Sequence, residues 1–87
     1  MSKKEPKQVK ANIAQAKVLE KNLLVAKGNA EHERLIKEID DLAASGSDPC
    51  LTFLNQARTD LKRGDVKDAL KVLAKYAECE QRELDVR

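Results

Sequence analysis

Hydrophobic residues recur at helical spacing through most of the chain, in four successive stretches. These stretches span residues 6–27, 30–44, 49–63 and 66–84. Within each stretch, apolar side chains return every three or four residues, which places them on one face of an α-helix. The pattern therefore predicts an all-α protein, built as a small bundle of about four short helices.

The second half of the chain predicts a helical hairpin hinged at Gly64-Asp65. Gly64 is the residue type that adopts the left-handed conformation closing a helix. Asp65 can cap the next helix by accepting backbone N–H groups, and Asp68 adds negative charge to its first turn. A connection this short requires two antiparallel helices with a shared core, which we expect to contain Leu54, Ala57, Leu61, Leu70, Leu73 and Ala77.

The turn at residues 64–70 resembles the inter-helix turn of tetratricopeptide hairpins, in which a Gly-Asp turn precedes a helix that opens with a small residue. The resemblance covers one hairpin, residues 53–77, whereas arrays of this kind need at least three repeats. Asp60 is polar where that pattern places a bulky residue. The resemblance therefore does not assign the chain to the family.

Gly28-Asn29 determines whether the first two helices are separate. At about 100° per residue, the apolar stripe of residues 30–44 is rotated by roughly 140° from that of residues 6–27. Lys27, Gly28 and Asn29 together form a signal that ends one helix and starts the next. We expect a break here; the alternative is one long kinked helix with the hairpin folded along it.

The ends of the chain and its longest apolar run bear on organisation and location. Residues 1–5 are polar, and we expect a frayed tail followed by a single helical domain at 6–87. The basic N-terminus is not followed by the apolar segment of a signal peptide. The longest apolar run, Leu23 to Ala26, is far too short to span a membrane. These features predict a cytoplasmic protein with no membrane association.

Cys50 and Cys79 are too few for a disulfide framework and lack the spacing of metal ligands. Since thiols of cytosolic proteins are normally reduced, we expect two free cysteines, with Cys50 buried on the apolar stripe of the third helix. The alternative is a reactive thiol at Cys50, activated by a helix N-terminus and paired with His32.

No pattern typical of a catalytic or cofactor site occurs. His32, the single histidine, has no partner at a metal-binding spacing, and the three glycines separate helices instead of forming a phosphate loop. Gly46, for example, is followed by Asp48-Pro49, a pair typical of the start of a helix. Asp40 and Asp41 are adjacent and cannot face each other as an acid/base pair. We therefore expect no enzymatic activity, no cofactor and no metal.

Charge is divided unevenly along the chain. Residues 1–28 carry seven lysines against two glutamates, whereas residues 29–48 carry two basic against six acidic groups. The two segments could neutralise each other across a hairpin. Alternatively, an electrostatic patch faces an acidic partner or nucleic acid, and its residues would be Lys7, Lys10, Lys17 and Lys21. Nucleic acid is disfavoured because the patch lacks arginine for base recognition and aromatic rings for stacking.

Four further residues lie to one side of the core stripes: Phe53, Val72, Tyr76 and Cys79. A wide bundle face could bury them; otherwise they are exposed apolar groups, which mark a binding surface. We expect a protein-binding surface here, with Tyr76 as a stronger candidate than Phe53 because a tyrosine hydroxyl prefers a wet or paired end. The sequence thus predicts a small non-catalytic adaptor, inhibitor or regulator of a larger macromolecule. The alternatives are a nucleic-acid-associated protein using the lysine-rich first helix and a structural homo-oligomer, such as a homodimer.

Overall fold

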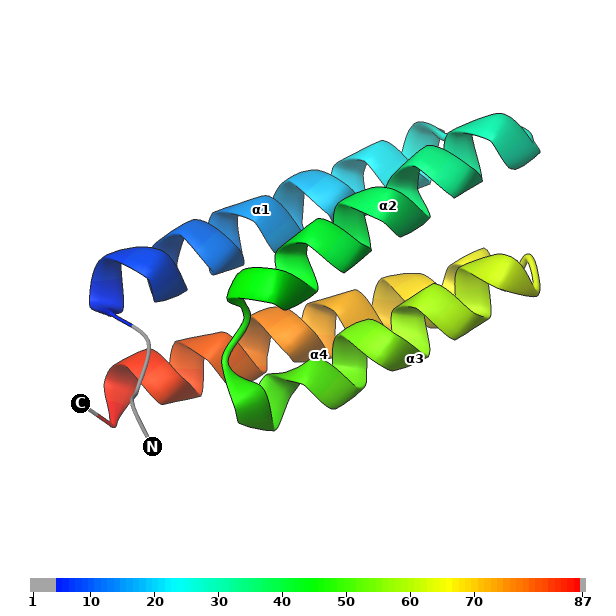
Figure 1. Ribbon diagram of the computed structural model, residues 1–87. Coiled ribbons are helices and arrows are strands. Elements are labelled where there is room, and N and C mark those ends of the chain that lie inside the picture. The colour runs from blue at the N-terminus through cyan, green and yellow to red at the C-terminus, as the bar shows by residue number, and fades with distance from the viewer. Residues whose placement is uncertain (1–4, 87) are drawn as a thin grey trace.

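The computed structural model describes residues 5–86, in which the chain forms a bundle of four α-helices (Figure 1). The helices are α1 (Pro6–Val25), α2 (Asn29–Ser45), α3 (Leu51–Lys62) and α4 (Val66–Asp85), and a short 3₁₀ turn, η1 (Asp48–Cys50), precedes α3. The predicted all-α bundle is confirmed. The tail expected at residues 1–5 lies, apart from Glu5, outside the described residues.

Successive helices run antiparallel, and the first and last helices are also neighbours (Figure 1). The helix pair α1–α4 makes the most extensive contact and α3–α4 the next, whereas α2 packs less closely against α1 and α3. The bundle measures 40 × 19 × 19 Å, which is two helices wide in both short directions. The α3–α4 hairpin and α1 therefore form the tightest part of the molecule.

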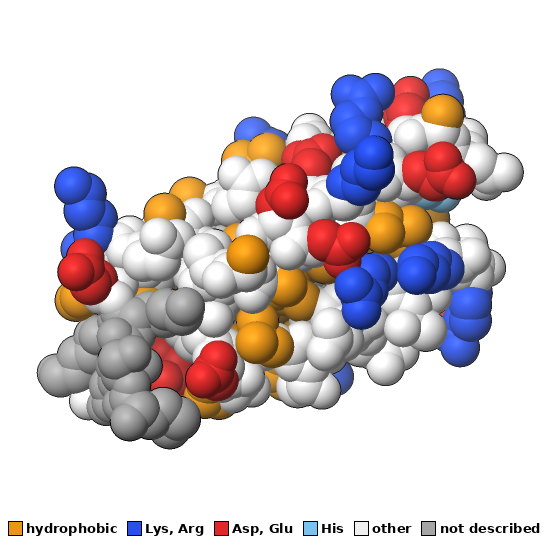
Figure 2. Space-filling model, in the orientation of Figure 1, with side chains coloured by type: hydrophobic (Ala, Val, Ile, Leu, Met, Phe, Trp, Pro, Cys, Tyr) orange, Lys and Arg blue, Asp and Glu red, His pale blue; other side chains and the backbone are white. Residues whose placement is uncertain are grey.

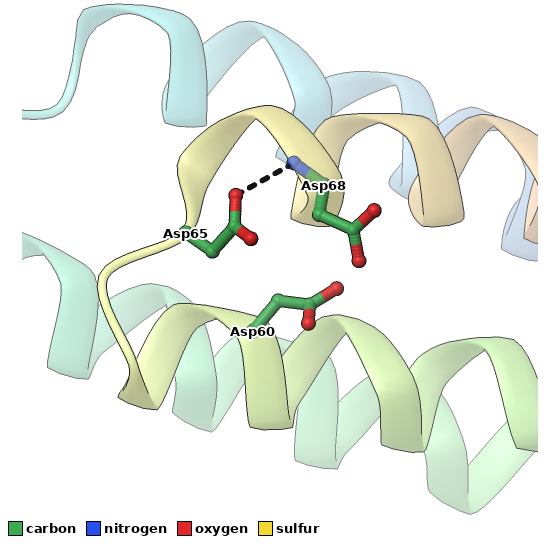
Figure 3. Close-up of side chains that lie close together, drawn as sticks. All are labelled: Asp60, Asp65 and Asp68. Atoms are coloured by element: carbon green, nitrogen blue, oxygen red, sulfur yellow. Dashed lines mark hydrogen bonds between the residues drawn. The ribbon is translucent and has the colours of Figure 1, made fainter.

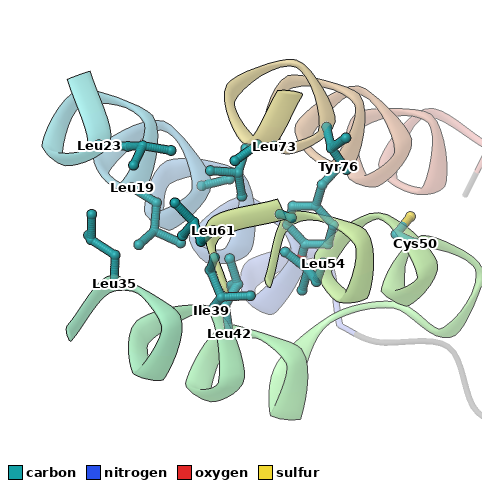
Figure 4. Close-up of a cluster of buried hydrophobic side chains, with 14 residues drawn as sticks. Leu19, Leu23, Leu35, Ile39, Leu42, Cys50, Leu54, Leu61, Leu73 and Tyr76 are labelled. Atoms are coloured by element: carbon teal, nitrogen blue, oxygen red, sulfur yellow. The ribbon is translucent and has the colours of Figure 1, made fainter. Parts of the chain in front are cut away.

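One apolar core runs through the bundle, and every α-helix contributes to it (Figure 4). In α1 the buried positions recur at alternating intervals of three and four residues, as in the seam of a coiled coil. The largest apolar side chains with almost no exposure are Leu19, Leu23, Ile39, Leu54, Leu73 and Tyr76. Four of the six residues expected in the hairpin core are fully or almost fully buried, and Leu70 and Ala77 are half-buried against it.

The predicted break between the first two helices is confirmed. Helix α1 ends at Val25, two residues earlier than the predicted limit of 27, and α2 begins at Asn29. Gly28 separates them with a φ of 83°, a conformation that side chains with a Cβ rarely adopt. The N–H of Lys27 donates a 2.7 Å hydrogen bond to the Glu31 carboxylate, which secures the turn. A continuous helix through this point is excluded.

The hinge before α4 has the predicted chemistry. Gly64 has a φ of 79°, and Asp65 accepts a 3.2 Å hydrogen bond from the N–H of Asp68. The start of the third helix differs in detail, because Ser47 precedes a 3₁₀ turn that includes Asp48 and Pro49. Across residues 5–86, no helix is both long and apolar enough to cross a membrane.

Candidate functional site

The four side chains expected at a protein-binding surface come from α3 and α4, and they are not exposed as a group. Tyr76 is fully buried and Val72 is 7% exposed. Phe53 and Cys79 are half-buried against the core. The expectation that these residues are exposed is therefore wrong for Tyr76 and Val72, which belong to the wide buried face that was the alternative.

Tyr76 is buried because its hydroxyl has a hydrogen-bond partner inside the bundle. Figure 4 shows its ring in the core beside Leu54. The hydroxyl donates a 2.5 Å hydrogen bond to Oε2 of Glu80, which lies one turn further along α4. Burial and this hydrogen bond raise the pKa of Tyr76 above its ordinary value. A tyrosine hydroxyl therefore does not need solvent here, because Glu80 supplies the polar partner.

Glu80 is a fully buried carboxylate that collects hydrogen bonds from three parts of the chain. Besides Tyr76, Ser47 donates to it twice, from its N–H at 2.9 Å and from its hydroxyl at 2.5 Å. The Nδ2 of Asn12 lies 3.4 Å from Oε2 and donates a weaker bond. The carboxylate thus connects α4 with α1 and with the loop before η1.

Asn12 extends this network toward the end of α2. Its Nδ2 donates to the Ser45 carbonyl at 2.8 Å, and its Oδ1 accepts from the Ser45 hydroxyl at 3.0 Å. Gln8 Nε2 donates to the same Oδ1 at 3.0 Å. We call this set the Glu80 network; its members are Gln8, Asn12, Ser45, Ser47, Tyr76 and Glu80. Because its buried polar groups are satisfied by one another, the network holds the bundle in one arrangement.

The sequence contains a signal for this network that hydrophobic periodicity passes over. Asn12 lies between Val9 and Ala16 on the buried stripe of α1, and Glu80 lies seven residues after Leu73 on that of α4. Polar residues at core positions are usually hydrogen-bonded to one another or to the backbone. Their coincidence at one end of two antiparallel neighbours would have indicated a contact.

Cys50 and Cys79 form a disulfide, with their Cα atoms 5.7 Å apart. The expectation of two free thiols is therefore wrong, and Cys50 is not available as a nucleophile. Cys50 is buried at the end of η1, and Cys79 is half-buried on α4 next to Glu80. The disulfide thus fixes the start of α3 to α4 beside the Glu80 network.

The position of this disulfide follows from the hairpin itself. Cys50 lies fourteen residues before Gly64, and Cys79 lies fourteen residues after Asp65. Residues equally distant from the hinge of an antiparallel hairpin reach the same level, because both helices rise by the same amount per residue. The equal distance of the two cysteines from the hinge is visible in the sequence, but the number of cysteines alone does not reveal it.

The hinge also holds three aspartates whose carboxylates converge (Figure 3). Asp60 is fully buried; its Oδ1 accepts hydrogen bonds from Gln56 at 3.0 Å and Arg63 at 3.3 Å. Its carboxyl and that of Asp68 are turned toward each other (Figure 3). The Asp60 carboxyl raises the pKa of Asp68, because only a protonated Asp68 can hydrogen-bond to it and because its negative charge disfavours a second one nearby. Asp60 was not among the candidate site residues predicted from the sequence.

The outward side of α1 carries the most exposed large apolar residues of that helix. Val18 is 45% exposed, Leu24 69% and Val25 72%. All four lysines of the expected electrostatic patch, Lys7, Lys10, Lys17 and Lys21, are exposed on the same helix. We call the exposed residues Lys10, Lys17, Val18, Lys21, Leu24 and Val25 the α1 outer face.

The expected neutralisation of α1 by α2 does not take the form of ion pairs. In residues 5–86, side-chain ion pairs join Arg58 to Asp40, at 2.6 Å, and Arg63 to Asp60 and Asp65. None of them involves a lysine of α1. The face formed by α2 and α3 instead mixes acidic and basic groups around an apolar seam (Figure 2).

His32 lies at a shallow hollow of about 510 Å³ between the start of α2 and the end of α3. The hollow is lined by Asn29, His32, Glu33, Ile36, Lys37, Leu61 and Lys62. These residues include no serine, threonine or cysteine that a histidine could activate. His32 is half-buried at the rim of the bundle.

Comparison with known proteins adds no functional information. The chain matches no protein family, no curated protein and no solved structure with which it was compared. Its function must therefore be argued from the surface and the buried groups described above.

Proposed function

We propose that this chain is a small non-catalytic binding protein that docks on an acidic surface of a larger protein through the α1 outer face. The observation that carries the proposal is the exposure of Val18, Leu24 and Val25, at 45%, 69% and 72%, on a helix that also presents lysines. Such a protein would act as an adaptor, an inhibitor or a regulator.

The α1 outer face has the composition of a docking surface. Val18 and Val25 are seven residues apart, which is two helical turns, so they lie on one side of α1. That side is opposite the buried stripe that contains Ala16 and Leu19. Around α1, Lys17 and Lys21 lie between Leu24 and the two valines, so the face combines apolar and charged groups, as protein interfaces do.

The charge of the α1 outer face favours an acidic protein partner. Within residues 5–86 its lysines form no side-chain ion pair, so their charge is available to a partner. Complementary charge speeds association and excludes partners of like charge. Nucleic acid fits less well, because α1 has no arginine and no aromatic residue and the acidic α2 is next to it.

The compartment in which the protein works is also part of this proposal. The cytoplasmic location expected from the sequence stays a prediction, and the Cys50–Cys79 disulfide weighs against it. Disulfides persist mainly in oxidising compartments, and they are rare in the cytosol of most organisms. A binding protein of an oxidising compartment fits the disulfide.

Charge reversal tests the electrostatic part of the proposal. The variant Lys17→Glu/Lys21→Glu changes the α1 outer face, and Lys67→Glu/Lys75→Glu makes the same change in net charge on α4. Proteins captured from the source organism by the parent should be lost with the first variant, retained with the second and released by salt. Equal capture by both variants would contradict the proposal, and so would capture that a nuclease abolishes.

A further inference from the structure

The acidic cluster at the α3–α4 hinge contains a buried oxygen without a partner. Asp60 is fully buried, and its Oδ2 is, among residues 5–86, the one buried side-chain oxygen or nitrogen that makes no hydrogen bond. An unpaired buried polar atom costs about 1–3 kcal/mol, and for a charged group the cost is higher. Such an atom requires a positively charged or hydrogen-donating partner.

Two further carboxylates lie close to that of Asp60. One ligand atom each from Asp60, Asp65 and Asp68 can be chosen so that all three lie within 4.8 Å of one another. Asp60 comes from α3, Asp65 caps α4 and Asp68 lies in its first turn, so the group spans the hinge (Figure 3). Asp65 uses Oδ1 for the cap, and its Oδ2 lies 3.8 Å from Arg63.

We propose that Asp60, Asp65 and Asp68 bind a calcium ion at the α3–α4 hinge. Calcium–oxygen distances are about 2.3–2.6 Å, so oxygens on opposite sides of the ion are up to roughly 5 Å apart. Magnesium–oxygen distances of about 2.0–2.1 Å allow only about 4.2 Å. The separations of at most 4.8 Å lie within the calcium limit. Water can complete the coordination, because Asp65 is exposed and Asp68 half-buried.

The surrounding cations limit the affinity of this site. Arg63 lies 3.3 Å from Asp60 Oδ1 and 3.8 Å from Asp65 Oδ2, and the positive charge of Lys71 acts on Asp68. The three carboxylates and the two cations together therefore have a net charge of −1. Three carboxylates with water ligands correspond to a weak site, with a dissociation constant of roughly 10⁻⁴–10⁻³ M. Arg63 is 62% exposed and is free to turn toward solvent.

The site is separate from the α1 outer face, and it differs from the sequence expectation of no metal. Calcium titration of the full chain, followed by amide chemical shifts, tests it directly. Calcium at roughly 10 mM, well above the expected dissociation constant, should shift amides of residues 60–68 and raise the melting temperature by roughly 5 °C or more. Sodium chloride of equal ionic strength, and magnesium, should have a smaller effect.

Three variants separate a built site from diffuse attraction of cations. Arg63→Gln removes a positive charge about 4 Å from the carboxylates and should tighten calcium binding about tenfold. Asp68→Asn should abolish binding and keep the fold, because its amide can donate to Asp60 Oδ2. Asp41→Asn removes an exposed carboxylate of α2 and should bind calcium like the parent.

Two results would overturn the proposal. One is the absence of localised shifts at residues 60–68, which would leave a shared proton or a water as the partner of Asp60 Oδ2. The other is equal calcium binding by the parent, Arg63→Gln and Asp68→Asn, since cations would then be attracted without a defined site.

Discussion

Glu80 shows at the scale of a single residue how this small bundle obtains a defined core. Its carboxylate is fully buried and accepts hydrogen bonds from Tyr76, Ser47 and Asn12. No basic side chain is among these partners, so the negative charge is balanced by hydrogen bonds alone. Removing one donor leaves the buried carboxylate with fewer hydrogen bonds, which destabilises the folded protein. If the Tyr76 hydroxyl were exposed to water, removing it would change the stability little. The stability of the bundle should therefore depend on single atoms of this network.

The first prediction concerns the Tyr76 hydroxyl. Tyr76→Phe removes one hydrogen bond to a buried charge and keeps the ring, so the free energy of unfolding should fall by about 1.5–3 kcal/mol in chemical denaturation. Tyr76→Ala also empties core volume and should cost about 3–5 kcal/mol, as for other large-to-small changes. A Tyr76→Phe protein as stable as the parent would show that the hydroxyl is solvated and that Glu80 has another partner.

The left-handed backbone conformation of Gly64 is a second single-residue feature, and it was predicted from the sequence. Gly64 has a φ of 79°, and a Cβ added to it would meet no atom within 4 Å. The cost of Gly64→Ala is therefore the left-handed backbone alone, about 1–2 kcal/mol in thermal or chemical unfolding. A neutral Gly64→Ala would mean that the hinge relaxes to a different turn.

At the scale of elements, the sequence predicted the helices and the hinge but not the cross-link between them. Periodicity and Gly-Asp punctuation were sufficient for α3, α4 and their turn, because these signals are local in the chain. The disulfide and the Glu80 network are contacts between distant residues. Periodicity assigns a residue to a face of its own helix and does not identify the residue opposite it. Tyr76 was placed outside the core for this reason.

The Cys50–Cys79 disulfide closes a loop across a separation of 29 residues. The loop-entropy relation gives about 3–4 kcal/mol for a closed loop of this size. Cys50→Ser/Cys79→Ser should therefore unfold at lower denaturant by about that free energy, and reducing the parent with dithiothreitol should reproduce the loss. Thiol titration of the native protein should find no free thiol. Two free thiols would restore the expectation of reduced cysteines.

On the scale of the whole molecule, the two sides of α1 differ: one packs in the bundle, and the other carries the proposed docking surface. The inner side packs against α4 and contributes Asn12 to the Glu80 network. The outer side exposes Val18, Leu24 and Val25 together with lysines. The sequence predicted the lysine patch but missed the apolar half, because these residues lie off the core stripe and isolated exposed aliphatic residues are common. Burial was needed to see them as one face.

The most direct test of this account compares two equivalent valines. Val25 on α1 is 72% exposed and Val86 beyond α4 is 67% exposed, and they lie at opposite ends of the bundle (Figure 1). Replacing either with serine should leave the melting temperature unchanged, because neither side chain is part of the core. In a titration against the captured partner, Val25→Ser should weaken binding about tenfold, the value of one buried valine, and Val86→Ser should not. Equal affinities for Val25→Ser and Val86→Ser would contradict the assignment of the α1 outer face as the docking surface.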